Sequence, residues 1–169
     1  RSLQRALNKD KASRRIITPD LGPLFSGEAE DGDLAAGFIY VLRSLSDDPF
    51  IAENRTVIHK IGVTGGDVKS RIANARKDPT YLMADVEIVA TYKLANINRK
   101  RIESLLHGFF SPARLDVELK DRFGSHVEPR EWFLVPLPVV EETIQKLIEG
   151  TIGDFQYDPK AAQILPFSK

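Results

Sequence analysis

The chain has 169 residues, 42% of them hydrophobic, a formal net charge of zero and no cysteine. These values are typical of one globular domain with a real core, and they exclude disulfides, thiolate zinc sites and cysteine nucleophiles. Because the net charge is zero, any attraction to nucleic acid must come from local patches. No apolar run approaches the roughly 20 residues that cross a bilayer, and the N-terminus lacks the apolar region of a signal peptide, so we expect a cytoplasmic protein with no membrane partner.

The first 35 residues are expected to be an arm and linker rather than part of the core. Residues 1–16 are basic and compatible with a helix, and an acidic, turn-rich linker follows at 26–33. The alternative is an arm that reaches a partner or nucleic acid through its cations, which are Lys9, Lys11, Arg14 and Arg15.

Two apolar, β-branched segments predict paired strands at 37–43 and 56–63. The connection at 44–55 is too long for a tight hairpin, so it is either decoration or a substrate-facing insertion. The alternation of the second strand puts His59 on the face opposite Lys60.

Three helices and two further strands follow. The first helix is expected at 67–77, because Asp67 can accept hydrogen bonds from its first free amides. A strand at 84–94 leads to a second helix at 98–110, capped by Asn96 or Asn98. The core stripe of this helix has helical spacing and consists of Ile102, Leu105, Leu106, Phe109 and Phe110.

A strand at 131–135 and a third helix, which begins at Pro138 and stops at Gly150, complete the core. The order of elements predicts a small α/β domain with a mostly antiparallel sheet covered by helices. We expect an arm and linker at 1–35, the core domain at 36–150 and a tail at 151–169. Because the chain starts at Arg1 and its only methionine is Met83, we also expect a processed piece whose partner domains are missing.

Several polar residues stand out from this structural pattern, and each has an ordinary structural explanation. Tyr40 can be a strand tyrosine with its hydroxyl at the edge, and Lys60 can extend from an edge strand toward water. Arg71 can pair with Asp67 one helical turn earlier. Glu103 and His107 can be an exposed pair on the second helix. His59 and His126 can be single histidines that are structural or exposed to solvent.

Taken together, these residues resemble the motifs of the GIY-YIG nuclease superfamily. The resemblance lies in Gly37-Phe38-Ile39-Tyr40, in Lys60-Ile61-Gly62, in Arg71 of the next helix and in Glu103 of the second helix. It covers about residues 36–149 and implies a small domain with a central three-stranded antiparallel sheet flanked by helices, plus an extra C-terminal strand and helix.

The resemblance also implies roles for the polar residues. Tyr40 would orient or deprotonate water, Lys60 would stabilise negative charge or act as a base, and Arg71 would grip the scissile phosphate. Glu103 would hold Mg²⁺ or Mn²⁺, and His107 would support it or transfer a proton. Lys60 stands where many members have a second tyrosine, and Ala75 stands where a histidine is often found. The segment Arg130-Glu131-Trp132-Phe133 resembles the late motif of the lysine-containing branch, so Glu131 is expected near the site.

The implied function is a metal-dependent endonuclease that hydrolyses phosphodiester bonds in DNA, with RNA as the less expected substrate. Phosphate contacts are expected from the cations along the first helix and at the start of the second, which are Lys69, Arg76, Lys77, Arg99, Lys100 and Arg101. The alternative is a module on the same fold that binds nucleic acid or protein without catalysis.

Overall fold

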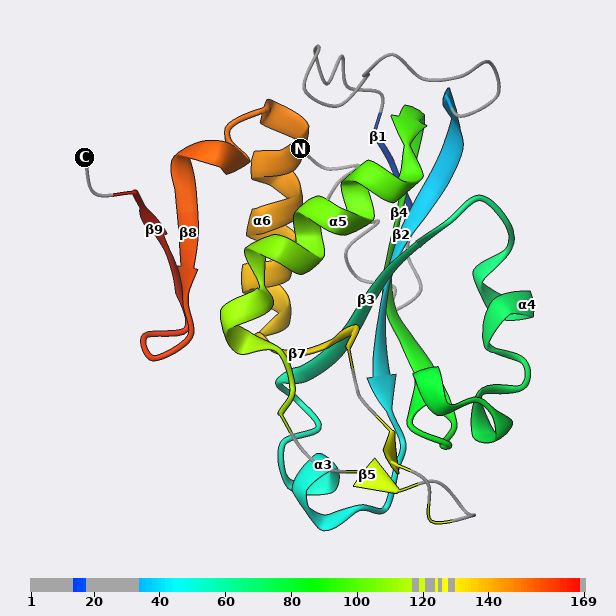
Figure 1. Cartoon of the computed structure of the whole chain (residues 1–169). Helices are drawn as coiled ribbons and strands as arrows, with labels where there is room; N and C mark the ends of the chain where they lie inside the picture. The colour runs from blue at the N-terminus through cyan, green and yellow to red at the C-terminus, as the bar shows by residue number, and fades with distance from the viewer. Residues whose placement is uncertain are drawn as a thin grey trace.

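A five-stranded sheet organises the chain in a computed structural model that describes residues 14–17, 34–116, 119–120, 124, 126–127 and 130–167 (Figure 1). The strands lie in the order β1-β4-β2-β3-β7. They span Arg14–Ile17 (β1), Leu34–Ser44 (β2), Ile58–Thr64 (β3), Val86–Asn98 (β4) and Trp132–Leu134 (β7). β1 is parallel to β4, whereas the other neighbours pair antiparallel.

The alternation of β2 divides the core between the two faces of the sheet. Ile39 and Val41 belong to the larger cluster, which packs under α5 (Arg99–Phe109) and α6 (Leu137–Glu149). Tyr40 and Leu42 belong to the cluster on the other face. That face is covered by α4 (Val68–Ile72) and by two 3₁₀ turns, η1 (Ala75–Lys77) and η2 (Pro79–Tyr81). Figure 1 shows the long helices on one side of the sheet and α4 on the other.

Local sequence signals fix the starts of α4 and α5 and the end of α6 as predicted. The side chain of Asp67 accepts from the amide of Ser70 at the start of α4, and the side chain of Asn98 accepts from the amide of Arg101 at the start of α5. α6 has a proline in its first turn and ends at Gly150, whose φ of 73° is the left-handed conformation that glycine adopts readily.

The helix expected at 67–77 is shorter than predicted. α4 ends at Ile72, and the chain continues through η1 and η2. Residues of low helix propensity, including Val68, Ser70 and Asn74, explain the early end. Asp78 then caps a new turn, because its side chain accepts from the amide of Thr80.

Short elements fill segments for which the sequence predicted little structure. The 44–55 connection contains α3 (Pro49–Glu53), which Asp48 caps and Ile51 anchors in the core. The segment between α5 and β7 holds η3 (Ser111–Ala113) and an antiparallel pair of short strands, β5 (Leu119–Lys120) and β6 (His126–Val127). In the tail, η4 (Ile152–Asp154) leads into an antiparallel hairpin of β8 (Phe155–Asp158) and β9 (Gln163–Pro166).

The predicted α/β class is confirmed, with an antiparallel sheet flanked by helices and a further strand and helix toward the C-terminus. The sheet is larger than three strands because β7 and β1 extend its two edges. A helix at residues 1–16 is wrong for the last residues of that segment, because Arg14–Ile17 pairs as a strand with β4. The rest of that arm and the 26–33 linker lie outside the described residues. Among the described helices, none has the length and apolar character needed to cross a membrane.

Candidate active site

The candidate site lies at the edge of β3 where β7 stops. β7 pairs with β3 only from Ile58 to Lys60. At Ile61 the backbone amide donates instead to the carbonyl oxygen of Glu131 (3.2 Å), and the backbone carbonyl lies 2.6 Å from Nε2 of His107. On this side of β3 no described strand pairs beyond this point, so we call this edge, from Ile61 to Thr64, the open edge of β3.

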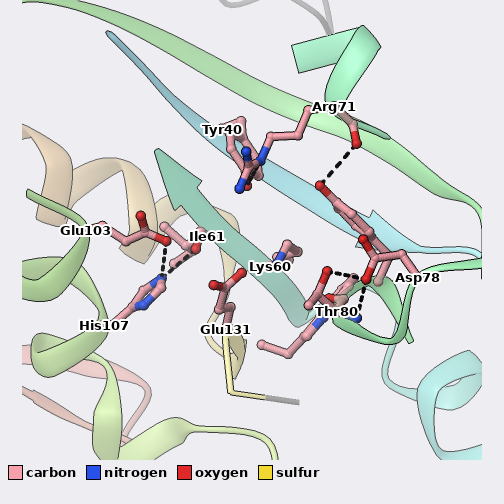
Figure 2. A network of polar contacts seen from close by, with 11 residues as sticks. Tyr40, Lys60, Ile61, Arg71, Asp78, Thr80, Glu103, His107 and Glu131 are labelled. Atoms are coloured by element: carbon pink, nitrogen blue, oxygen red, sulfur yellow. Dashed lines mark hydrogen bonds and ion pairs between the residues drawn. The ribbon is translucent and has the colours of Figure 1, made fainter. Parts of the chain in front are cut away.

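Tyr40 and Arg71 form a hydrogen-bonded pair beside the open edge. Arg71 lies on α4, and its Nε donates to the Tyr40 hydroxyl at 3.1 Å (Figure 2). The Tyr40 ring lies against Gly62, its partner on β3, where an added Cβ would collide with both the hydroxyl and the ring. The motif glycine is therefore required by the close approach of this ring.

The Tyr40 hydroxyl is a neutral group at physiological pH. Burial raises its pKa to about 12, although the hydrogen bond and positive charge of Arg71 oppose the rise. A phenol with this pKa carries its proton at pH 7, and its oxygen already accepts a hydrogen bond from Arg71.

Lys60 and Glu131 form a second pair. The Lys60 side chain is almost completely buried, and its ammonium forms an ion pair with the Glu131 carboxylate from the turn before β7. The same ammonium lies 5.0 Å from the centre of the Tyr81 ring, within range of a cation–π interaction. The explanation of Lys60 as a lysine that extends to water is therefore wrong, since its charge is held inside by a carboxylate and a ring.

Glu103 and His107 reach the open edge from α5. They are one helical turn apart, with 3.9 Å between Oε1 of Glu103 and Nε2 of His107. Because a carbonyl can only accept, the short contact to Ile61 assigns the proton to Nε2 of His107. Burial raises the pKa of Glu103, the Glu131 carboxylate raises it further, and the positive charges of Lys60 and Arg71 act in the opposite direction.

Glu103 is the residue at the open edge that could hold a magnesium or manganese ion. Mg²⁺ commonly takes one or two protein carboxylates and completes its shell with water and substrate phosphates. Glu103 supplies such a carboxylate, and a cation beside it would relieve the effect of Glu131 that raises its pKa. Among the described residues, no group of three His, Cys, Asp or Glu side chains forms a complete cage of protein ligands.

The predicted phosphate-binding cations lie on two separate elements. Asn98, Arg99, Lys100, Arg101 and Ser104 line a surface pocket of about 410 Å³ at the start of α5. Arg99 has a packing role as well, because its guanidinium occupies the space that a side chain at position 65 would need. The other predicted cations are exposed on α4 and η1, and they are Lys69, Arg76 and Lys77. Of these, Arg76 is paired with Asp85 at 2.7 Å.

Two histidines lie outside the site. His59 is completely buried on the sheet face opposite Lys60, as predicted, and its Nδ1 lies 2.7 Å from the carbonyl oxygen of Val135. Burial lowers the pKa of His59 to about 4, so this residue is a neutral part of the core. His126 is exposed on β6.

The sequence did not indicate Tyr81, which lies within the site. Tyr81 is 4% exposed, its hydroxyl donates to the backbone carbonyl of Arg71 at 3.4 Å, and it packs in the same core cluster as Tyr40. The sequence signal near Tyr81 is the Asp78-Pro79 pair, which is typical of a capped turn. This pair predicts a turn but not that the Tyr81 side chain lies in the site.

Residues 37–148 match the family model of the T5orf172 domain, which covers well over half of the chain. The chain belongs to the T5orf172 domain family. A curated relative, "Uncharacterized protein YeeC" of Bacillus subtilis (strain 168), is 40% identical to it over 134 residues. These residues are 79% of this chain and 35% of YeeC, so the chain spans about a third of that relative. No solved structure matches this T5orf172 domain.

The assignment to the GIY-YIG nuclease superfamily is therefore wrong, because the family model that matches is that of the T5orf172 domain. The motifs behind that assignment are short segments around Tyr40, around Lys60 and at 130–133, with two single residues, Arg71 and Glu103. They constrain only a few scattered positions, whereas the T5orf172 match runs continuously from the first motif through most of α6. The contacts at the open edge are independent of the family name.

Proposed function

We propose that this domain is a divalent-metal-dependent endonuclease that hydrolyses phosphodiester bonds in DNA. One arrangement carries the proposal: the Tyr40–Arg71 pair, the buried Lys60–Glu131 pair and the Glu103 carboxylate surround the open edge of β3 (Figure 2). Phosphodiester hydrolysis needs an oriented nucleophile, positive charge on the phosphate and help for the leaving oxygen, and these residue types supply each of them.

Arg71 is proposed to bind the scissile phosphate. It is exposed, and its bond to Tyr40 uses Nε. The two terminal nitrogens can therefore donate parallel hydrogen bonds to phosphate oxygens while Nε keeps the guanidinium in place. Lys60, held between Glu131 and the Tyr81 ring, adds fixed positive charge behind the site.

Tyr40 is proposed to orient the attacking water. A pKa of about 12 argues against a phenolate that removes a proton at neutral pH. Glu103 would hold Mg²⁺ or Mn²⁺, which supplies charge compensation and an acidified water when bound. His107, bonded through Nε2 to Ile61, is proposed to keep the Glu103 side chain directed at the open edge.

The exposed cations on α4 and at the start of α5 are proposed to contact the nucleic-acid backbone. Such contacts give affinity without sequence information and weaken as salt concentration rises. We also propose that the domain acts in the cytoplasm, the setting expected from its sequence.

Cleavage of defined substrates tests the proposal. Single-stranded, double-stranded and branched DNA, and matched RNA, are incubated with the protein in Mg²⁺, Mn²⁺ or EDTA. We expect metal-dependent cleavage of DNA that is lost in Glu103→Gln and retained in Glu142→Gln, which changes an exposed glutamate on α6. Salt-sensitive binding without cleavage, unchanged by Glu103→Gln, would instead identify a non-catalytic binding module. Cleavage of RNA alone would contradict the proposed substrate.

A further inference from the structure

We propose that Tyr81 is a positioning residue of this site, because it directs the Tyr40 hydroxyl toward water and holds the Lys60 ammonium beside Glu131. The expected effect of Tyr81 on the cleavage rate rests on the proposed function. Its effect on the Tyr40 hydroxyl can be measured without any cleavage.

Tyr81 contacts both members of the Tyr40–Arg71 pair, since its hydroxyl bonds to Arg71 and its side chain packs in one cluster with Tyr40. The Tyr81 hydroxyl donates to the carbonyl oxygen of Arg71 at 3.4 Å, so its oxygen remains free to accept a proton. In the proposed arrangement it accepts the proton of Tyr40, which packs in the same cluster. Arg71 Nε donates to Tyr40 in turn, so the proposed bond would close a ring of hydrogen bonds.

This ring of bonds determines what Tyr40 presents to the substrate. A phenol oxygen has one proton and two lone pairs. The Tyr40 proton is used toward Tyr81 and one lone pair is used by Arg71, which leaves a single lone pair for an incoming group. Tyr40 can therefore act only as a hydrogen-bond acceptor toward the substrate side. A water molecule can donate one of its protons to the remaining lone pair and be held in this way. Without the Tyr81 hydroxyl, the Tyr40 proton is free to rotate and this direction is lost.

The Tyr81 ring has a separate effect on Lys60. The Lys60 ammonium lies 5.0 Å from the ring centre while it is paired with Glu131. The aromatic face therefore covers one side of a buried charge, and the carboxylate lies against it from another direction. The hydroxyl and the ring of Tyr81 can be tested separately, since phenylalanine keeps the ring and leucine removes it.

The loop that carries Tyr81 is built to hold it there. Asp78 accepts hydrogen bonds from the amide and the hydroxyl of Thr80, at 2.9 Å and 2.8 Å (Figure 2). The indole of Trp132 donates to the carbonyl oxygen of Thr80 at 3.0 Å. Leu82 and Met83 then turn the chain with φ of 60° and 54°, a left-handed conformation that is costly for such side chains. Strain of this kind persists only where surrounding contacts hold the loop in place.

An ordinary core tyrosine is the competing explanation, and the chain provides a matched control for it. Tyr157 on β8 is also 4% exposed, and its hydroxyl donates to a backbone carbonyl, that of Leu134, at the same 3.4 Å. It packs in the cluster under α5 and α6, on the other face of the sheet from Tyr81. Tyr157→Phe therefore removes a hydroxyl that is buried and bonded as that of Tyr81 is, but that lies away from the site.

The first measurement is the single-turnover cleavage rate of Tyr81→Phe and Tyr157→Phe, with thermal unfolding as a check on folding. We expect Tyr81→Phe to lower the rate about tenfold, the factor given by one neutral hydrogen bond, with little change in KM. Tyr157→Phe should keep the wild-type rate, and Tyr81→Leu should lose more activity than Tyr81→Phe because Lys60 loses its ring. Equal rates for Tyr81→Phe and Tyr157→Phe would overturn the inference.

The second measurement does not depend on cleavage. The chain has 4 tyrosines, so labelling their ζ carbons gives a simple NMR spectrum in which Tyr40→Phe identifies the Tyr40 signal. We expect this signal to shift in Tyr81→Phe and to stay in place in Tyr157→Phe. An unchanged Tyr40 signal in Tyr81→Phe would overturn the inference. If the wild type cleaves none of the substrates, the proposed function fails, while a shifted Tyr40 signal still supports the positioning contact.

Discussion

The hydroxyl of Tyr40 accepts a hydrogen bond from Nε of Arg71 at 3.1 Å, although the two residues are 31 positions apart in the sequence. This bond ties β2 to α4. In the chain, β3 lies between these two elements, and in the sheet it is the neighbour of β2. The position of the proposed phosphate-binding arginine therefore depends on the position of the Tyr40 ring.

Gly62→Ala is expected to displace Tyr40 and to inactivate the protein. The added methyl group would collide with the hydroxyl and ring of a buried tyrosine, and overpacking of this kind costs about 1–3 kcal/mol. Chemical unfolding and a cleavage assay measure both effects. The control is Gly108→Ala on α5, where a Cβ meets nothing within 4 Å and helix propensity should raise stability by up to about 1 kcal/mol. Wild-type cleavage by Gly62→Ala would contradict this prediction.

The Lys60–Glu131 pair should respond unequally to the loss of its two partners. Glu131→Gln leaves a buried ammonium without its carboxylate, a loss of about 3–5 kcal/mol. Lys60→Met should cost less, because the Glu131 side chain is 35% exposed and water can solvate it. Urea unfolding of both variants gives the comparison. Asp85→Asn, which breaks the exposed pair with Arg76, should cost less than about 1 kcal/mol. A greater loss for Lys60→Met than for Glu131→Gln would show that the burial argument is wrong.

His59 should make the fold sensitive to acid. Burial lowers its folded pKa to about 4 from an ordinary 6.5, so the unfolded chain takes up the proton first as pH falls. The stability that depends on neutral His59 is complete above pH 6.5 and is lost as pH falls toward 4, with a total of about 3 kcal/mol. Unfolding free energies across this range should depend less on pH in His59→Gln than in the wild type. His126→Gln, at an exposed histidine, should keep the wild-type dependence, and an equal dependence in all three proteins would refute the assignment.

Lys100 and Arg101 should contribute to DNA affinity rather than to the chemical step. Each alanine substitution is expected to weaken binding and to reduce the slope of log affinity against log salt concentration by about 1, as for one lost phosphate contact. The cleavage rate at saturating DNA should change little. Lys160→Ala, at the exposed turn between β8 and β9, is the control of matched charge. Salt slopes equal to that of the control would argue against phosphate contact at the start of α5.

Features encoded by neighbouring residues could be predicted from the sequence. Asp67, Asn98 and Gly150 mark helix ends because their side chains or backbone preferences act within one turn. The alternation of β3 likewise placed His59 on the face opposite Lys60, whereas the register that puts Tyr40 and Lys60 on one face comes from the structure.

Features that depend on distant segments could not be predicted from local patterns. The Lys60–Glu131 pair spans 71 positions, and Glu131 was expected near the site only through a family resemblance that proved wrong. Tyr81 reaches Tyr40 through a loop with no periodicity, whose direction depends on left-handed turns at Leu82 and Met83. The strand at Arg14–Ile17 becomes apparent only when β4 is present to pair with it.

Single-turnover cleavage of labelled DNA by Arg71→Lys tests the central claim most directly. Lysine keeps the positive charge but loses both the Nε bond to Tyr40 and the planar pair of donors to phosphate. We predict a fall in rate of about 100-fold or more, as for the loss of a group that stabilises transition-state charge. Arg76→Lys, at an exposed arginine a short distance along the same segment, should cleave as the wild type does. A wild-type rate for Arg71→Lys, or an equal fall in both variants, would contradict an active site built around the Tyr40–Arg71 pair.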